Sequence, residues 1–203
     1  MKTIRFYGMM LMTVMLAFCM ASCGDDDDED DGGGTTATIP TKYRTILSPY
    51  ITIYDGENPP MLDGTFLMSP DELVYTSDGA KEPGAILSDY YVKFSKMNSS
   101  KGTIVYQGKT KNGSADAGIS ASITGNGNNF TVFFTTTSSY KGATDKRFTI
   151  FSGTLTAKGI QNLHWAWIVT DKTNDPNNYL PEEGVYRIFK DGDGMAENAV
   201  WPE

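Results

Sequence analysis

The sequence predicts an all-β fold. From Tyr43 onward, short apolar stretches alternate with clusters of Gly, Asn, Asp and Pro, and β-branched and aromatic residues are frequent, which favours strands. No long stretch repeats apolar residues with a 3.6-residue period, so long amphipathic helices are not expected. The chain has 203 residues, of which 39% are hydrophobic, and this length suits a single folded domain.

About ten strands are expected, joined mostly by short turns. The segment Gly125-Asn126-Gly127-Asn128 is typical of a hairpin turn, because Gly and Asn tolerate positive φ. Short turns of this kind join antiparallel neighbours. The tail from Met195 is expected to hold one helical turn at most. The candidate strands are residues 43–47, 50–54, 64–68, 72–76, 89–95, 102–107, 118–124, 129–136, 147–156, 163–170 and 185–190.

Alternation along the strands predicts which side chains face the core. A bulge is expected near Ser152-Gly153, and Phe133 and Phe151 fall on the nominal outer faces, which indicates central strands of two layers or a second covered surface. The expected inward sets are Tyr90, Val92 and Phe94, then Ile119, Ala121 and Ile123, then Phe130, Val132 and Phe134, and finally Phe148 and Ile150.

Two architectures fit about ten sequential antiparallel strands. One is an up-and-down barrel of the lipocalin-like or calycin-like kind, and the other is a two-sheet sandwich. The short sequential hairpins favour the barrel. Since no linker-like break follows Pro40, we expect one all-β domain over residues 40–203.

The N-terminus has the pattern of a secretory signal peptide over residues 1–22. Lys2 and Arg5 precede a run from Phe6 to Cys19 that contains no charged residue, and small residues follow. The run is shorter than the roughly 20 residues that a membrane-spanning helix needs.

The segment Met20-Ala21-Ser22-Cys23 resembles the lipobox of bacterial lipoproteins, with Met20 where that family usually has Leu. The resemblance implies cleavage just before Cys23 and a diacylglyceryl group on its thiol. The partner of Cys23 is then a lipid bilayer, and multiple acyl chains give stable anchoring. This resemblance covers only the first 23 residues and implies nothing about the domain.

An acidic tract follows Cys23. Seven consecutive acids, residues 25–31, precede Gly32-Gly33-Gly34, and such a stretch predicts a disordered tether over residues 23–39. The tract also resembles the export signal of some Gram-negative surface lipoproteins. That resemblance implies an outer-membrane protein, lipid-anchored and facing the cell exterior. The alternative is a plain spacer on a protein that faces the periplasm.

Composition excludes several classes of function. The formal net charge is −8, so a nucleic-acid partner bound through phosphate neutralisation is not expected. With two Cys and one His, counting alone excludes a disulfide scaffold, a Cys-rich zinc domain and a His-based metal cluster, and no metal or cofactor is predicted. Without the acidic tract and the two leader bases, 18 acids and 15 bases remain, which is an ordinary net charge of −3.

The candidate ligand-binding residues are aromatic. Trp165 and Trp167 share one face of a strand, about 6.5–7 Å apart, where they could stack on a sugar ring or contact an apolar ligand. Leu163 and Val169 share that face, so both indoles could instead belong to the core. Tyr91, an outward-facing aromatic residue, is the third candidate. No catalytic residue is assigned, because no nucleophile-elbow motif is present.

Three functions remain open. The favoured one is a non-catalytic lipoprotein whose β domain binds a glycan or a small apolar ligand. The second is a structural or protein-interaction module of an envelope complex. The third is a polysaccharide hydrolase, which would need two inward carboxylates in a cleft.

Overall fold

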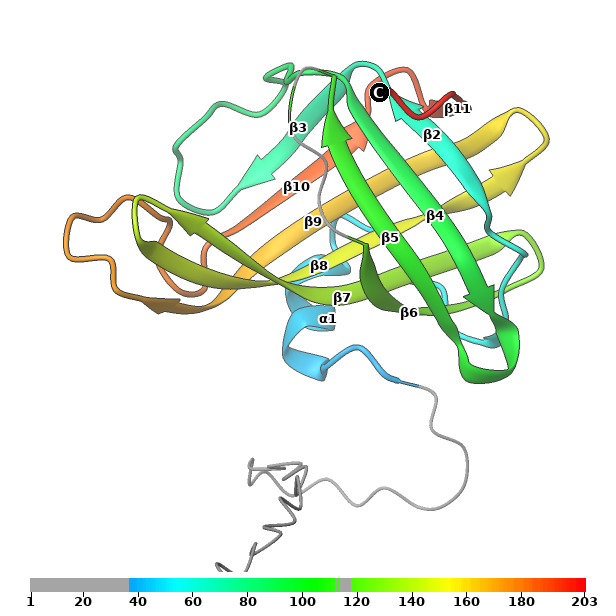
Figure 1. The fold of residues 1–203 in the computed structure, drawn as a ribbon, viewed down its shortest axis with the longest axis horizontal. Coiled ribbons are helices and arrows are strands. Elements are labelled where there is room, and N and C mark those ends of the chain that lie inside the picture. The colour runs from blue at the N-terminus through cyan, green and yellow to red at the C-terminus, as the bar shows by residue number, and fades with distance from the viewer. Residues whose placement is uncertain (1–36, 112, 114–117) are drawn as a thin grey trace, which may run out of the picture. The chain divides into compact units, whose positions relative to one another are not determined.

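The computed structural model describes residues 37–111, 113 and 118–203, and it confirms the all-β fold (Figure 1). The expected signal peptide, the lipobox with Cys23 and the acidic tract lie outside the described residues. Ile39, expected at the end of the tether, is buried against the domain.

Eleven strands, one α-helix and one 3-10 helix are formed by the described residues. Most strands follow one another as antiparallel neighbours, as the short turns predict. The elements are α1 (Thr41–Leu47), β1 (Glu57–Asn58), β2 (Gly64–Met68), β3 (Asp71–Thr76), β4 (Tyr90–Asn98), η1 (Ser99–Lys101), β5 (Thr103–Thr110), β6 (Ile119–Asn126), β7 (Asn129–Tyr140), β8 (Ala143–Thr156), β9 (Gly159–Thr173), β10 (Tyr186–Asp191) and β11 (Met195–Asn198).

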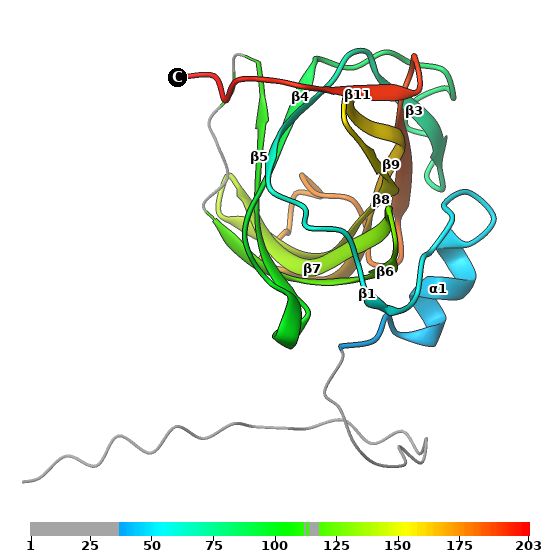
Figure 2. The same cartoon turned by 90° about the vertical axis from the view of Figure 1, so that its right-hand side faces the viewer.

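The strands form one sheet that closes into a ring. From β4 to β10 each strand pairs with the next along the chain, and β2 pairs with β4. The ring closes at β11, which pairs with β2 on one side and with the beginning of β9 on the other. In Figure 2 the strands surround a central axis and α1 lies outside them.

The ring is uneven because its strands differ greatly in length. β8 has 14 residues and β9 has 15, whereas β2 has five and β11 has four. The beginning of β9 pairs with β11, and its middle pairs with β10, which in turn pairs with β3. The register shift between Ser152 and Thr154 confirms the bulge expected near Ser152-Gly153.

The inside of the ring is filled by alternating side chains. The inward sets predicted for β4, β6 and β7 are confirmed, since Val92, Phe94, Ile123, Phe130 and Val132 are each at most 1% exposed and belong to one core cluster. Aromatic rings pack edge to face there, which is a favourable geometry for neighbouring π systems.

The prediction of strands at residues 43–47 and 50–54 was wrong. The first segment forms α1, and the second forms no strand. Pro40 precedes the helix, where its fixed φ suits a helix start. Tyr43, Ile46 and Leu47 then fall on one side of α1, and this apolar side packs against the sheet. Tyr43 stacks on Phe148 of β8 with ring centroids 4.6 Å apart.

The inward set predicted for β8 was also wrong. Phe148 and Ile150 lie on the outer face beneath α1, whereas Phe151 joins the core inside the ring. Because α1 covers the outer face, both faces of β8 are apolar, and alternation alone does not identify the inner one. Phe133 belongs to the same outer cluster, which is the second covered surface that the sequence indicated.

The third difference concerns the tail, where β11 replaces the expected helical turn. Ala196 of this short strand is fully buried inside the ring. Its pairing depends on Gly159, which has a φ of +147° at the start of β9. A Cβ at Gly159 would overlap the carbonyl oxygen of Ala196, so the close approach of β9 and β11 requires glycine there.

Gly159→Ala should therefore destabilise the domain by at least about 3 kcal/mol, because it combines backbone strain with a steric overlap at the ring closure. Gly142→Ala is the matched control: Gly142 also has a positive φ, +85°, but a Cβ there meets nothing within 4 Å. The control should cost about 1 kcal/mol. Urea unfolding of both variants tests this, and equal losses of stability would contradict it.

Candidate functional site

A cavity of about 430 Å³ is lined by residues of the ring strands, including Thr136 to Ser138 and Arg147 of the β7–β8 hairpin. Strands β4 to β9 all contribute to its wall. Of the described side chains that line it, half are apolar or aromatic and half are polar. They are Tyr90, Tyr106, Ile119, Phe134, Trp165 and Trp167, and Thr135, Thr136, Thr137, Ser138, Arg147 and Thr149.

Trp165 is held within a stack of aromatic rings. Its ring centroid lies 4.3 Å from that of Phe189 and 5.3 Å from that of Tyr90, with nearly parallel planes. Its indole Nε1 donates a hydrogen bond of 3.1 Å to Asp71 Oδ1. These contacts fix the orientation of Trp165, so it forms a rigid part of the cavity wall.

Trp167 is flanked by two arginines. The guanidinium carbon of Arg147 lies 4.6 Å from the indole centroid, and that of Arg187 lies 5.1 Å from it. Arg147 comes from β8 and Arg187 from β10, the strands that pair with β9 at Trp167. Both contacts are cation–π interactions, which stabilise buried guanidinium groups. Trp167 is only 7% exposed, so little of its ring is open to a ligand.

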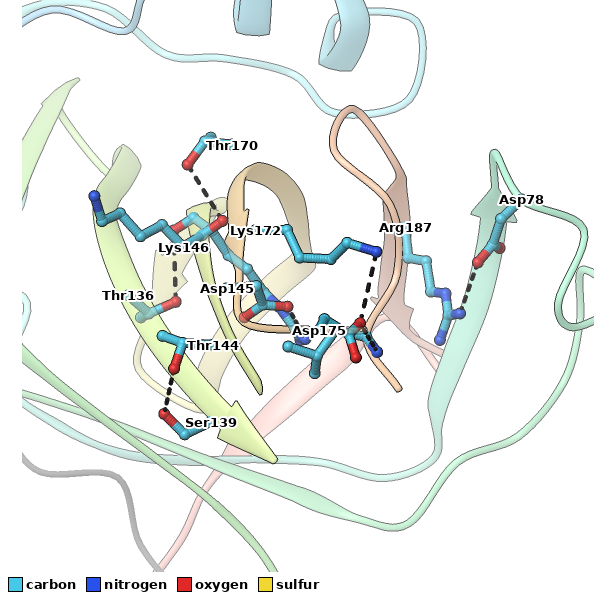
Figure 3. Close-up of polar contacts among 12 residues, drawn as sticks. Asp78, Thr136, Ser139, Thr144, Asp145, Lys146, Thr170, Lys172, Asp175 and Arg187 are labelled. Atoms are coloured by element: carbon cyan, nitrogen blue, oxygen red, sulfur yellow. Dashed lines mark hydrogen bonds and ion pairs between the residues drawn. The ribbon is translucent and has the colours of Figure 1, made fainter. Parts of the chain in front are cut away.

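Each arginine forms an ion pair. Arg147 donates from Nε and Nη2 to a single oxygen of Asp145, at 2.9 and 2.6 Å. Arg187 donates from Nη2 to Asp78 at 3.0 Å, a pair that Figure 3 shows. Among the described residues, the buried side-chain atoms without a hydrogen-bond partner are Asp145 Oδ1 and Arg187 Nε. Both belong to the ion pairs beside Trp167.

The carboxyl group of Asp78 is strongly acidic. Burial acts to raise its pKa, but hydrogen bonds from the Thr76 hydroxyl, the Ala80 amide and Arg187 stabilise the anion and lower the pKa to about 2. Asp78 therefore stays ionised and keeps Arg187 paired at physiological pH.

Two tyrosine hydroxyl groups lie side by side next to the cavity. The hydroxyl oxygens of Tyr90 and Tyr106 are 2.5 Å apart. Gly108 of β5 faces them, and a Cβ at this position would overlap both hydroxyl groups. The missing side chain at Gly108 thus makes room for the tyrosine pair next to the cavity.

Two buried carboxyl groups lie beneath Trp165. Burial raises the pKa of Asp71 to about 6, the hydrogen bond from Trp165 opposes this rise, and the charge of Asp191 adds to it. Burial likewise raises the pKa of Asp191 to about 6, helped by the hydrogen bond with Asp193. Asp191 also accepts from the backbone amides of Ser69 and Met195, at the corners where β2 leads to β3 and β10 leads to β11.

The structure brings two of the three candidate residues together. Trp165 and Trp167 line the cavity, and each ring is largely covered by protein side chains. Tyr91 does not line it and lies on the other side of β4 from Tyr90, which does. His164 lies on the outer face, with its Nδ1 3.0 Å from the carbonyl oxygen of Asn162.

Arg147 is the cavity residue that sequence reasoning missed. Its position could be found from strand alternation, because Arg147, Thr149 and Phe151 lie two residues apart along β8 and share the inner face. The predicted inward positions of β8, Phe148 and Ile150, place Arg147 on the outer face, whereas the structure places it on the inner one.

Comparison of the chain with protein-family models, with curated proteins and with solved structures gave no match. Within residues 37–111, 113 and 118–203, no group of three or more His, Cys, Asp or Glu side chains is placed to hold a metal ion. In the same residues, no helix has the length and apolarity needed to span a membrane.

Asp71→Asn should change how stability depends on pH. The folded pKa of Asp71 is about 6 against an ordinary value of 3.8, so its ionisation makes the folded state less stable as pH rises from about 4 to about 6. Asparagine removes this loss and keeps an acceptor for Trp165. The free energy of unfolding of the variant, relative to that of the wild type, should increase by about 2 kcal/mol as the pH rises from about 4 to about 7.

Denaturant unfolding at a series of pH values measures this effect. The exposed Asp63→Asn substitution is the control and should follow the wild-type curve. Parallel curves for the wild type and Asp71→Asn would show that Asp71 is not buried as described.

Proposed function

We propose that the barrel domain binds a small organic ligand in the cavity between β4 and β9 without transforming it, and that Cys23 anchors the protein to the outer membrane. The cavity is the observation that carries the binding proposal. Its volume of about 430 Å³ is within the range of small-molecule sites, and its lining combines apolar walls with a few polar groups, as such sites do.

The lining favours a small apolar molecule over a glycan. A sugar ring would need an open aromatic face, but Trp167 is covered by two guanidinium groups and Trp165 by neighbouring rings. The remaining aromatic and aliphatic surface of the lining, which includes Tyr90, Phe134 and Ile119, can pack against an apolar ligand.

Binding is preferred to hydrolysis for a related reason. A glycosidase places two carboxyl groups beside the scissile bond. The described residues that line the cavity include no Asp or Glu. Asp71 and Asp145 are buried behind the wall, where Trp165 and Arg147 are their partners.

The anchor rests on the sequence. The lipobox-like Met20-Ala21-Ser22-Cys23 supports lipidation of Cys23, and the acidic tract supports export to the cell exterior, with the periplasmic face as the alternative. Acyl chains on Cys23 would hold the domain at the membrane through the tether.

Filling the cavity should abolish binding. Thr149→Phe places a ring in the cavity and should weaken the binding of fluorescent ring compounds such as N-phenyl-1-naphthylamine at least about tenfold. Thr173→Phe, on the exposed end of β9 and outside the lining, is the control. Fluorescence titration measures both. Failure of the wild type to bind any neutral or anionic ring compound would refute the proposed function.

Lipidation has a separate test. Cells labelled with palmitate should incorporate the label in the wild type and in Cys19→Ala, and should lose it in Cys23→Ala, because Cys19 lies in the segment that is removed. Protease treatment of intact cells should then digest the wild-type domain. Equal labelling of the wild type and Cys23→Ala would exclude the anchor, and complete protection from protease would favour the periplasmic face.

A further inference from the structure

We infer that the ligand of the barrel cavity is a ring-bearing carboxylate, and that the guanidinium group of Arg147 binds its carboxyl group. This inference rests on the proposed function and adds the chemical class of the ligand. Arg147 is the charged residue among the described residues that line the cavity. A carboxylate on an apolar body fits these described lining residues, which are one cation together with apolar and hydroxyl-bearing side chains.

The first argument concerns the donors of Arg147 that remain open. A guanidinium group has five N–H donors in a fixed plane. Asp145 uses Nε and one hydrogen of Nη2, and both bonds end on the same carboxylate oxygen. Nη1 makes no hydrogen bond within the described residues, and the side chain is 21% exposed. The edge formed by Nη1 and Nη2 can therefore receive a carboxylate in bidentate geometry.

The second argument concerns orientation. Trp167 lies against the guanidinium group and Asp145 holds its far edge, so the plane of Arg147 is fixed before a ligand arrives. A preorganised donor loses little conformational entropy on binding, which increases affinity. Thr149 is the next inward residue on β8, and its hydroxyl makes no hydrogen bond within the described residues. It can donate a further hydrogen bond to the same anion.

The third argument concerns the balance of donors and acceptors. The polar side chains of the lining are the guanidinium group of Arg147 and hydroxyl groups, with neither carboxylate nor amide among the described lining residues. A ligand rich in hydroxyl groups needs strong acceptors as well as donors, whereas a carboxylate needs donors only. Asp145 offers a ligand no acceptor, because its second oxygen is covered and its side chain is 0% exposed.

The apolar wall accounts for the rest of the ligand. Tyr90, Tyr106, Phe134 and Ile119, which come from β4 to β7, also line the cavity and offer aromatic and aliphatic surface to an apolar ring. Arg187, the second guanidinium group at the Trp167 indole, is neutralised by its ion pair with Asp78. The described lining therefore combines the guanidinium group of Arg147 with apolar and aromatic surface.

The test compares 2-naphthoate with 2-naphthamide, which differ in charge and little in shape. Calorimetry uses the purified full-length protein in nanodiscs of zwitterionic lipid, with empty nanodiscs as the blank. The wild type should bind naphthoate at least about tenfold more tightly than naphthamide. Arg147→Gln should reduce this preference to within about twofold, and Arg147→Lys should retain part of it, because a lysine keeps the charge without the bidentate edge.

Two further variants separate this account from its alternatives. Asp145→Asn removes the neutralising charge and should increase the affinity for naphthoate at least about threefold, whereas a ligand that donates to Asp145 would bind more weakly. Lys146→Gln removes an adjacent, exposed charge on the same strand and should leave the preference unchanged. Thermal unfolding of every variant confirms that it is folded.

The outcomes are distinct. Equal affinity of the wild type for naphthoate and naphthamide, or weaker naphthoate binding by Asp145→Asn, would overturn the inference even if Arg147→Gln failed to fold. Binding of neutral ring compounds that Thr149→Phe abolishes, without binding of naphthoate, would overturn the inference and leave the proposed function standing. Absence of binding by every ring compound would overturn the proposed function itself.

Discussion

Closure of the sheet by β11 is the constraint on which the rest of the structure depends. β11 is the short strand that pairs with both β2 and β9, and without it the sheet would have two open edges. Closure makes one face of every ring strand an interior face, and it forces the long β9 to serve two partners, β11 at its beginning and β10 beyond it. The glycine at position 159 allows the close approach that this double pairing needs.

A closed ring of unequal strands explains why the interior is filled at one end and hollow at the other. Phenylalanines such as Phe94 and Phe130 fill the part of the interior that also contains Ala196 of the closing strand β11. Toward the tip of the β7–β8 hairpin, the inward positions carry Thr136, Arg147 and Thr149, which are too polar to pack as a core. Their inward direction follows from strand alternation. The charge of Arg147 is tolerated there because Asp145 and the indole of Trp167 are its partners.

Alternation along a strand predicted the inner faces of β4, β6 and β7 and the shared face of Trp165 and Trp167. It assigned the inner face of β8 wrongly, because both faces of β8 carry large apolar side chains. The outer face of β8 is apolar because α1 covers it. α1 itself has only seven residues, and over so short a segment the apolar pattern of a helix is hard to tell from that of a strand. β11 has no apolar alternation and is defined by its partners. The arrangement of Arg147 and Arg187 around Trp167 depends on the register of three strands, which single-strand patterns do not contain.

The central claim is that the ring interior around Trp167 is a ligand site. The chain has three tryptophans, and their indole N–H signals can be followed one by one by nuclear magnetic resonance in ¹⁵N-labelled protein. Titration with 2-naphthoate should shift the signals of Trp165 and Trp167, together with the Arg147 guanidinium signal, and leave that of Trp201 unmoved, since Trp201 follows β11 and does not line the cavity. Shifts confined to Trp201, or none at saturating ligand, would contradict the account.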